Sequence, residues 1–423
     1  MAVGGATGAR LPRWIAGLLL AIAVACQPLP DATPMGREAT LGPAVSVRHA
    51  DFEAALSGPV ETRFGSGDAA HVLRVALPDS RPIECSLRRG EARFAVDVDR
   101  ETERLLDALR GDGHAITHRS IYGVRAGAIG GTPYLWVATE FVRTRGEERA
   151  WGLVKVASAE TAGFVVLCSH AEAGFVASFD RVFEELVGSL RSLEPRVEPI
   201  FRQICTTRFG ALDVSFASAE VHREGDGSFV LRAVSSEAFP LTRDQLDSYF
   251  SRRVERSDAA GILASSRLVF WSDGTRKQDL TLDREEGRWR VRGRFEDAEV
   301  DRFLDHDGPI HGRLHHLVAL RHRLLPHQPH LVVEHVFWRP SPRRTLSDHI
   351  GSGAPARIET DWTRVDNEAP YDQLGRKSWY DGRIRRDQRG FADAGELTVG
   401  PVALTVTCVH REGDLEKPPD LRR

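Results

Sequence analysis

The sequence contains very little lysine, asparagine and methionine: its 423 residues include four Lys, one Asn and two Met. Arginine therefore supplies most of the positive charge. This bias is typical of GC-rich coding, so abundant arginine is weak evidence for a phosphate-binding or carboxylate-binding site. Lysine and arginine together number 57 against 60 acidic residues, which gives a net charge of −3. Nucleic-acid-binding proteins favour a clustered basic face, so this balance gives no electrostatic basis for a nucleic-acid partner.

Several catalytic motifs are also absent. The sequence has no His-Glu-x-x-His motif of a zinc hydrolase, no Gly-x-Ser-x-Gly elbow, no Ser-x-x-Lys pair, no P-loop and no dinucleotide fingerprint. Ser169 and His170 are neighbours in the sequence, but adjacency says nothing about their geometry. We therefore predict no catalytic residue, no cofactor and no enzymatic activity.

The amino-terminal segment has the pattern of an export signal. Arg10 and Arg13 form a short positive head, and an apolar run of eleven residues follows, from Trp14 to Val24. A membrane-spanning helix needs about 20 apolar residues, so this run is too short to cross a bilayer. A positive head, an apolar core and an exit of small residues are typical of a cleaved secretory signal. We predict a signal peptide over residues 1–25.

The end of this segment, Ala23-Val24-Ala25-Cys26, resembles the lipobox of bacterial lipoproteins. The family pattern usually has Leu at the position of Ala23, so the match is relaxed. The resemblance implies that Cys26 is lipidated and becomes the new amino terminus, tethering the protein to the outer membrane or to the periplasmic face of the cell envelope. Ala23-x-Ala25 also suits ordinary signal cleavage before Cys26, so plain secretion is an alternative, as is an uncleaved anchor.

Four cysteines follow Cys26, and an even number in an exported chain suggests disulfide bonds. Four cysteines allow three pairings. Two of them precede residue 195 and two follow residue 200, which favours pairing within each half, as Cys85–Cys168 and Cys205–Cys408. The alternative is four buried thiols.

Residues 26–45 are rich in Pro, Gly and Ala and lack periodicity, which is typical of a flexible tether. Residues 46–193 are predicted to form an α+β domain. A short helix is expected at Glu101–Leu109, and strands at 134–143, 150–157 and 164–168. A closing helix is indicated by apolar residues at Phe179, Val182, Phe183, Leu186, Val187 and Leu190, which share one helical face. Helices that cover a meander of strands form an α–β sandwich.

The order of these elements resembles PsbP/DcrB-like domains. The resemblance is based on the strand at Tyr134–Arg143, the strand that ends at Cys168 and the final helix, and it includes no diagnostic motif. It implies a binding or accessory domain rather than an enzyme.

Residues 194–199 contain Pro195 and Pro199 and are predicted to be a linker. Residues 200–412 are predicted to form a mainly antiparallel β domain with one or two helices, followed by a disordered tail over residues 413–423. Thr242-x-x-Gln245 matches a capping box and predicts a helix to about Val254. Strands are expected at 267–271, 277–282, 288–292, 357–365, 376–380 and 397–409. Turns are expected at Asp273-Gly274, Glu286-Gly287 and Asp381-Gly382, because Asp-Gly is a hairpin signal.

This second domain resembles the curved-sheet carriers of the LolA/LolB type. The shared feature is a late Trp379-Tyr380-Asp381-Gly382 turn inside a meander of strands. The resemblance implies a concave sheet that holds an acyl chain.

Histidine is the one residue type with an unusual concentration, because eight of the sixteen histidines lie in residues 306–335. His311, His315 and His322 would share one face of a helix, and two histidines four residues apart can chelate a transition metal. The alternative is an exposed polar face, and we predict no metal ligand from this pattern.

These features together predict an α+β, two-domain, lipid-anchored envelope protein. It would act by binding or scaffolding, with the membrane as one partner and a protein or a hydrophobic ligand as another. The alternatives are a periplasmic carrier of lipids or hydrophobic ligands, and a metal-binding protein that uses residues 306–335.

Overall fold

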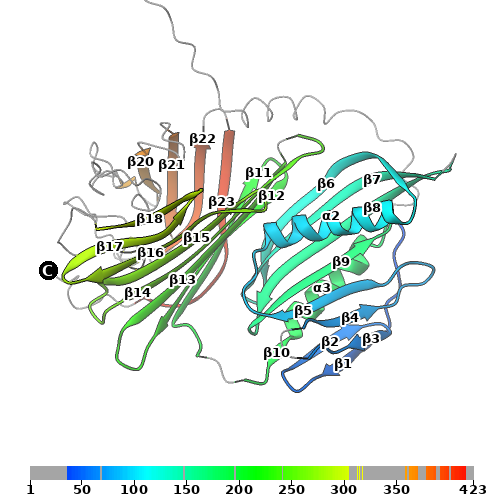
Figure 1. The fold of residues 1–423 in the computed structure, drawn as a ribbon, viewed down its shortest axis with the longest axis horizontal. Helices are drawn as coiled ribbons and strands as arrows, with labels where there is room; N and C mark the ends of the chain where they lie inside the picture. Colours follow the sequence, from blue (N-terminus) through cyan, green and yellow to red (C-terminus); the bar gives the residue numbers. More distant parts are fainter. Residues whose placement is uncertain are drawn as a thin grey trace, which may run out of the picture.

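The computed structural model describes residues 36–66, 69–145, 148–194, 197–240, 242–303, 312, 314, 317, 358–359, 362–369, 378–386, 391–399 and 402–415. Strands dominate these residues and form three antiparallel sheets, of three, seven and thirteen strands. Figure 1 shows the seven-stranded and thirteen-stranded sheets beside each other. We call residues 36–194 the first half and residues 197–415 the second half.

The predicted α+β sandwich is wrong, because the described residues form a mainly β protein. The described residues contain the helices α2 (Ala95–Gly111) and α3 (Val176–Ser189). The helix expected at Glu101–Leu109 lies inside α2, and the expected closing helix is confirmed as α3. Both lie in the first half, and each packs on a sheet that is much larger than itself (Figure 1).

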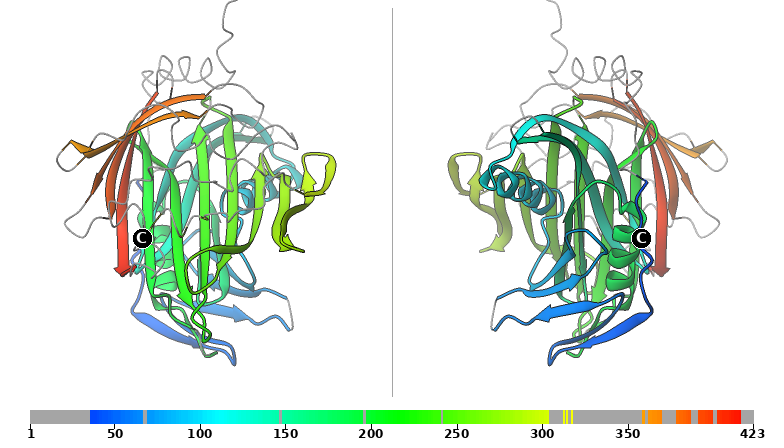
Figure 2. Two further views of the ribbon diagram at one scale, coloured as in Figure 1. Left: turned by 90° about the vertical axis from the view of Figure 1, so that its left-hand side faces the viewer. Right: turned by 90° about the vertical axis from the view of Figure 1, so that its right-hand side faces the viewer.

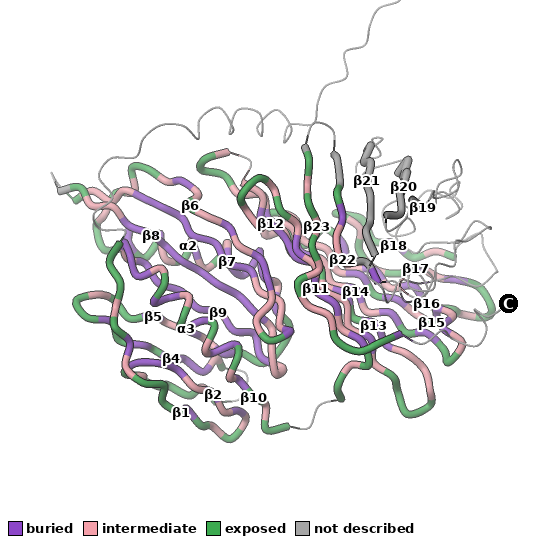
Figure 3. The backbone as a smooth tube through the Cα atoms, turned by 180° about the vertical axis from the view of Figure 1, so that it is seen from behind, coloured by how far each residue is buried: buried purple, intermediate pink, exposed green. Residues whose placement is uncertain are grey.

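The seven-stranded sheet forms the centre of the first half. The buried residues of its long central strands lie on both of its faces, Leu135 and Val137 on one and Trp136 and Ala138 on the other, because neighbouring side chains in a strand point to opposite sides. Figure 3 shows this burial along β7, β8 and β9. In spatial order the strands are β3 (Val60–Arg63), β4 (His71–Val75), β5 (Ile83–Arg89), β9 (Phe164–Ala171), β8 (Glu148–Thr161), β7 (Thr132–Arg145) and β6 (Ala115–Ile129).

Helix α3 covers one face of this sheet. Its stripe of Phe179, Val182, Phe183, Leu186 and Val187 is buried in one cluster with residues of β5, β8 and β9. The helix also contacts β2 of a small sheet, and its first turn is held by the Glu38 carboxylate, which accepts from the N–H groups of residues 177 and 178. The small sheet contains β1 (Ala44–Arg48), β2 (Phe52–Ser57) and β10 (Arg191–Ser192).

The thirteen-stranded sheet forms the second half. Its first strand, β11, pairs with its last strand, β23, so the two ends of the second half meet in the middle of the sheet. Figure 2 shows the sheet curving, with its two outer groups of strands on opposite sides. In spatial order the strands are β18 (Ala298–Phe303), β17 (Arg288–Phe295), β16 (Thr275–Glu285), β15 (Leu263–Ser272), β14 (Leu246–Ser257), β13 (Phe229–Pro240), β12 (Leu212–Arg223), β11 (Phe201–Phe209), β23 (Val402–Gly413), β22 (Ala392–Val399), β21 (Ser378–Arg386), β20 (Trp362–Ala369) and β19 (Ile358–Glu359).

Two of the predicted turns are confirmed. Asp273-Gly274 joins β15 to β16 and Glu286-Gly287 joins β16 to β17, with positive φ at all four residues. Positive φ at both central residues is what the tightest hairpin turns require. The third expected turn, Asp381-Gly382, is wrong. Both residues lie inside β21, where they pair with Asp366 and Val365 of β20, so the feature shared with LolA/LolB-type carriers is not a turn here.

The helix predicted after Thr242 is also wrong. Thr242 does accept a hydrogen bond from the N–H of Gln245 at 3.0 Å, as a capping residue would. The bond instead closes the turn between β13 and β14, and residues 246–257 continue as a strand that pairs with β13 along its whole length. Pairing with a neighbouring strand has therefore overridden a local helix signal. No helix in the described residues is long and apolar enough to cross a membrane.

Candidate functional site

The two halves meet at an interface between the first half's helix α2 and the second half's strands β13 and β14. Phe94, which precedes α2, is 1% exposed, and its ring lies 4.8 Å from that of Phe216 and 6.3 Å from that of Phe250. Ile204 and Ala238 of the second half belong to the same buried cluster. The halves therefore share a hydrophobic core.

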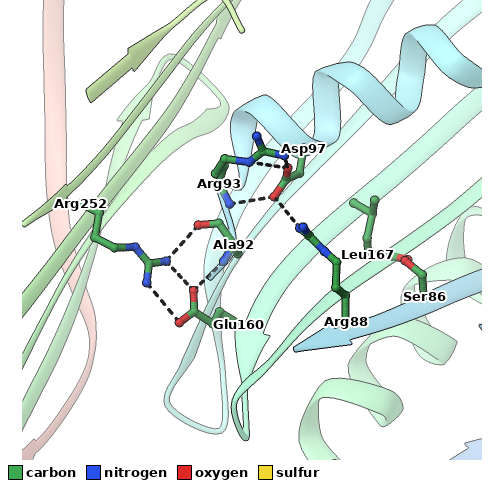
Figure 4. Close-up of polar contacts among 8 residues, drawn as sticks. All are labelled: Ser86, Arg88, Ala92, Arg93, Asp97, Glu160, Leu167 and Arg252. Atoms are coloured by element: carbon green, nitrogen blue, oxygen red, sulfur yellow. Dashed lines mark hydrogen bonds and ion pairs between the residues drawn. The ribbon is translucent and has the colours of Figure 1, made fainter. Parts of the chain in front are cut away.

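A polar network crosses the same interface (Figure 4). Arg252 of β14 donates to the Glu160 carboxylate of β8 at 2.5 Å and to the carbonyl of Ala92 at 2.9 Å. Glu160 in turn accepts from the Ala92 N–H at 2.8 Å. The Arg252 side chain is 11% exposed, so the pair is screened much less than a surface ion pair.

The start of α2 is held from the second half as well. The Ala95 N–H donates to the hydroxyl of Ser236 at 3.0 Å. Arg93 stacks over the ring of Trp271, with 5.3 Å to the centroid, and also donates to Asp97 in the first turn of the helix (Figure 4). Asp97 lies inside the helix, which begins at Ala95. These contacts position the helix against the large sheet.

A group of acidic residues lies near the turns of the second half. Burial and the neighbouring Asp273 raise the pKa of Asp247 to about 6, against a hydrogen bond from Tyr249 that lowers it. Burial, followed by the charge of Asp247, raises the pKa of Tyr249. Burial alone raises the pKa of Glu237, which pairs with Tyr249 across β13 and β14. Strand pairing and the turns place these carboxyls in this part of the sheet.

Ser169 and His170 do not form a catalytic pair. The Ser169 hydroxyl donates to Glu101 of α2 at 2.7 Å, whereas the His170 Nε2 lies 3.1 Å from the carbonyl of Arg81. They are consecutive residues of β9, so their side chains point to opposite faces of the sheet. Burial and the charge of Lys155 lower the pKa of His170 to about 3, so this imidazole is neutral at pH 7.

Three side chains of the first half come together in a cluster that the sequence reasoning missed. His49 and Asp51 lie between β1 and β2, and His71 begins β4. One ligand atom from each lies within 4.8 Å of the others, and these residue types can hold a metal ion. Burial, then the charge of His49, lowers the pKa of His71. The only sequence signal was the spacing His49-x-Asp51, which is too short and too common to stand out beside the histidines of residues 306–335.

The four predicted disulfide cysteines are joined as Cys85–Cys168 and Cys205–Cys408. The first bond links β5 to β9, and the second links β11 to β23, the first and last strands of the second half. In both cases the two cysteines are directly opposite each other in the strand pairing. Neither bond connects one half to the other.

The remaining predicted site residues lie outside the described part of the chain. They include the lipidation residue Cys26, and the same holds for His311, His315 and His322, which belong to the alternative of a metal-binding segment. Of residues 306–335, the structure describes residues 312, 314 and 317, and the side chain of Leu314 is buried against Phe201 and Leu231 of the large sheet.

No protein-family model matches the chain, and no curated protein matches it. Solved structures with some similarity include a β-barrel-like protein of the domain of unknown function DUF1849 from Brucella abortus. It is 9% identical, with a TM-score of 0.31, and the match covers 51% of this chain and 99% of that one. The cyanobacterial PsbP of Synechocystis sp. PCC 6803 is 14% identical with a TM-score of 0.26 and coverages of 38% and 99%. A protein from Bacteroides thetaiotaomicron is 16% identical with a TM-score of 0.22 and coverages of 39% and 53%. Similarity at this level carries no argument about function.

Proposed function

We propose that this protein is a non-enzymatic binding or scaffolding protein of the cell envelope, tethered to a membrane through a lipid on Cys26. The observation that carries the scaffolding role is the interface between the halves. Phe94 is buried among rings of the large sheet, and Arg252 is bonded to Glu160 and Ala92. A body held in this way presents the surfaces of both halves in a constant relative position, which suits a scaffold.

The polar groups best suited to catalysis have structural partners, which supports a non-enzymatic role. The Lys155 ammonium donates to the carbonyls of Glu172 and Gly174. Ser169 and His170 lie on opposite faces of β9, bonded to Glu101 and to Arg81. His170 Nε2 also lies 3.3 Å from the Ser80 hydroxyl. Burial lowers the pKa of this imidazole to about 3, so it is too weak a base to activate a nucleophile at pH 7.

The anchor is tested by fractionation and labelling of cells that produce the full chain. The unaltered protein is expected in the membrane fraction and should incorporate labelled fatty acid, whereas Cys26→Ala should be unlabelled and released in soluble form. Ala25→Ser, which retains the cysteine and a small residue before it, is the matched control and should remain membrane-bound. If the unaltered protein is unlabelled and soluble, the proposed lipid tether is wrong.

The second candidate function is a carrier of apolar ligands, favoured by the face of the large sheet that points away from α2. On this face Leu268, Leu280 and Trp289 belong to one buried cluster. Among the described residues, the hydroxyl of Ser266 and the side-chain carbonyl of Gln278 are buried there without a hydrogen-bond partner. Buried polar atoms of this kind usually have a partner, and a polar group on an otherwise apolar ligand would supply one.

The carrier function is tested by extracting the purified full chain with organic solvent and analysing the extract by mass spectrometry. A carrier should retain an apolar molecule in a fixed molar ratio, and Leu280→Arg should lower that ratio. Arg267→Ala, which removes an exposed ion pair with Asp279 on the same pair of strands, should leave it unchanged. An extract without a stoichiometric apolar molecule would exclude the carrier function.

A further inference from the structure

We propose that His49, Asp51 and His71 form a binding site for a divalent transition-metal ion such as zinc. Asp51 Oδ2 lies 3.6 Å from Nδ1 of His49 and 3.9 Å from Nε2 of His71. All three ligand atoms are within 4.8 Å of one another. The inference is independent of the tether and of the scaffolding role.

The geometry is close to what a bound ion requires. Zinc binds histidine nitrogen and carboxylate oxygen at 2.0–2.2 Å in a tetrahedral arrangement, which places neighbouring ligand atoms about 3.4 Å apart. The two measured distances to Asp51 exceed this by a few tenths of an ångström. Nδ1 of His49 also accepts a hydrogen bond from the Asp51 N–H at 3.3 Å. Side-chain rotations that release this contact and close the remaining gaps would bring the three atoms, which lie within 4.8 Å of one another, to one ion. Three protein ligands leave a fourth position open for water or another ligand.

The His71 side chain is 5% exposed, and its Nε2 is the nitrogen that lies towards Asp51. The other ring nitrogen, Nδ1, is buried without a hydrogen-bond partner among the described residues. Because the ion would bind Nε2, Nδ1 is left for a water molecule, which would supply the partner that buried polar atoms nearly always have.

The carboxylate of Asp51 is oriented by a residue on its far side. Arg89 lies 3.4 Å from Oδ1, which leaves Oδ2 directed towards the two imidazoles. Arg89 itself makes two bonds of 3.0 Å to Glu194. Arg89, Asp51 and Glu194 together carry a single net negative charge, which favours a cation. Partners that orient a ligand in this way are typical of metal sites.

Two phenylalanine rings lie beside the cluster. The ring of Phe64 lies 4.8 Å from that of His49, and the ring of Phe52 lies 5.3 Å from that of His71. The two imidazole rings are 4.4 Å apart. Phe52 is completely buried and excludes water on its side of the cluster, which strengthens electrostatic attraction there, whereas Phe64 is 41% exposed. His49 and Asp51 are 24% and 35% exposed, so an ion can enter from the solvent side.

The test uses the full chain with His311→Gln, His315→Gln and His322→Gln as the starting background, so that zinc held by the other histidine-rich segment is reduced. Zinc content is measured after equilibrium dialysis. We expect Asp51→Asn and His71→Gln each to lower the bound zinc by one equivalent. His222→Gln is the matched control, because His222 also lies 3.6 Å from a carboxylate, that of Glu220, and it should retain the full content.

Zinc should also raise the melting temperature of the background and of the control, because an ion that binds the folded state stabilises it. The same zinc concentration should not change the melting temperature of Asp51→Asn. If His71→Gln fails to fold, Asp51→Asn still decides the outcome, since Asp51 is partly exposed. Equal zinc content in the background and in Asp51→Asn would overturn the site.

Discussion

Lys155 is completely buried, and its nitrogen donates to the carbonyls of Glu172 and Gly174 at 2.8 and 2.6 Å. Burial lowers its pKa to about 7, although the charges of Glu38 and Glu172 oppose the shift. The ammonium group thus loses its hydration on folding and gains two hydrogen bonds, to carbonyl oxygens that would otherwise have no donor here. Lys155 is one of four lysines in a chain that uses arginine almost everywhere else, and arginine could not shed its charge here.

This burial predicts that the stability of the protein depends on pH through Lys155. The folded-state pKa is below the unfolded one, so the unfolded chain binds more protons between pH 7 and pH 10.5. Stability from this group therefore rises with pH across that window, by up to about 1.4 kcal/mol per pH unit. The measurement is urea unfolding of the unaltered protein and of Lys155→Met at pH 7 and pH 9.5. Relative to Lys155→Met, the free energy of unfolding of the unaltered protein should be larger at pH 9.5 than at pH 7. An equal difference at both pH values would contradict the lowered pKa.

Asp247 leads to the opposite dependence. Its folded-state pKa of about 6 is above its ordinary value of 3.8, so its contribution is fully present below pH 3.8 and is lost as the pH rises through 6. Asp247→Asn, which stays neutral, should therefore raise the melting temperature at pH 7.5 and leave it nearly unchanged at pH 4. Asp279→Asn is the control variant. Because Asp279 pairs with Arg267 and Arg276, its replacement should not raise the melting temperature at either pH. Destabilisation by Asp247→Asn at pH 7.5 would be inconsistent with the raised pKa.

At the scale of elements, the sequence predicted the helix and the turns that depend on residues close together in the chain. The stripe from Phe179 to Leu190 predicted α3, since all its apolar residues lie on one side of a helix regardless of what they contact. Asp273-Gly274 and Glu286-Gly287 predicted hairpins, because each tight turn needs residues that tolerate positive φ. Thr242 shows the limit: its capping bond to Gln245 exists, but the same bond can start a helix or close a turn.

The hairpin of β16 and β17 contains a glycine whose replacement should be costly. Gly293 has a φ of +129°, and an added Cβ would overlap the carbonyl of Asp279 on β16. Gly293→Ala should therefore lower the free energy of unfolding by about 3 kcal/mol, from backbone strain and the overlap together. Gly210→Ala is the matched control, because Gly210 has a φ of +58° and nothing within 4 Å of an added Cβ, so its cost should be about 1 kcal/mol. Equal midpoints of urea unfolding for the two variants would contradict the overlap.

At the scale of the molecule, the two disulfides lie one in each half, so the covalent link between the halves is the chain between β10 and β11. The shared core and the network of Arg252 supply the other links. From the sequence, the halves were predicted as two separate domains. The contact among Phe94, Phe216 and Phe250 could not be predicted, because these residues are spread over more than 150 positions of the chain.

This arrangement predicts that the halves stay together after the linker is cut. A site for a specific protease is placed within residues 194–199 of the full chain, and the cleaved protein is analysed by size-exclusion chromatography. The halves should elute together. Combining Phe94→Ala with Arg252→Ala should separate them, because a buried ring contributes about 3–5 kcal/mol and Glu160 loses a buried partner.

The control for this experiment combines Tyr122→Ala with Arg267→Ala, which remove an exposed ring and a surface ion pair. The cleaved control should still elute as one species. Separation of the halves in the unaltered protein would show that the interface is weak and would remove the main support for a scaffold.

The sequence by itself determined the features that depend on neighbouring residues: the hairpin strands at 267–271, 277–282 and 288–292, the two confirmed turns, the stripe of α3, and the division of the cysteines between the halves. The tertiary structure alone decided that residues 246–257 are a strand, because β13 supplies hydrogen-bond partners along its whole length. It also decided which residues meet from distant positions, namely Phe94 with the large sheet, and His71 with His49 and Asp51. Such contacts depend on how sheets pack in space, and no local pattern encodes that packing.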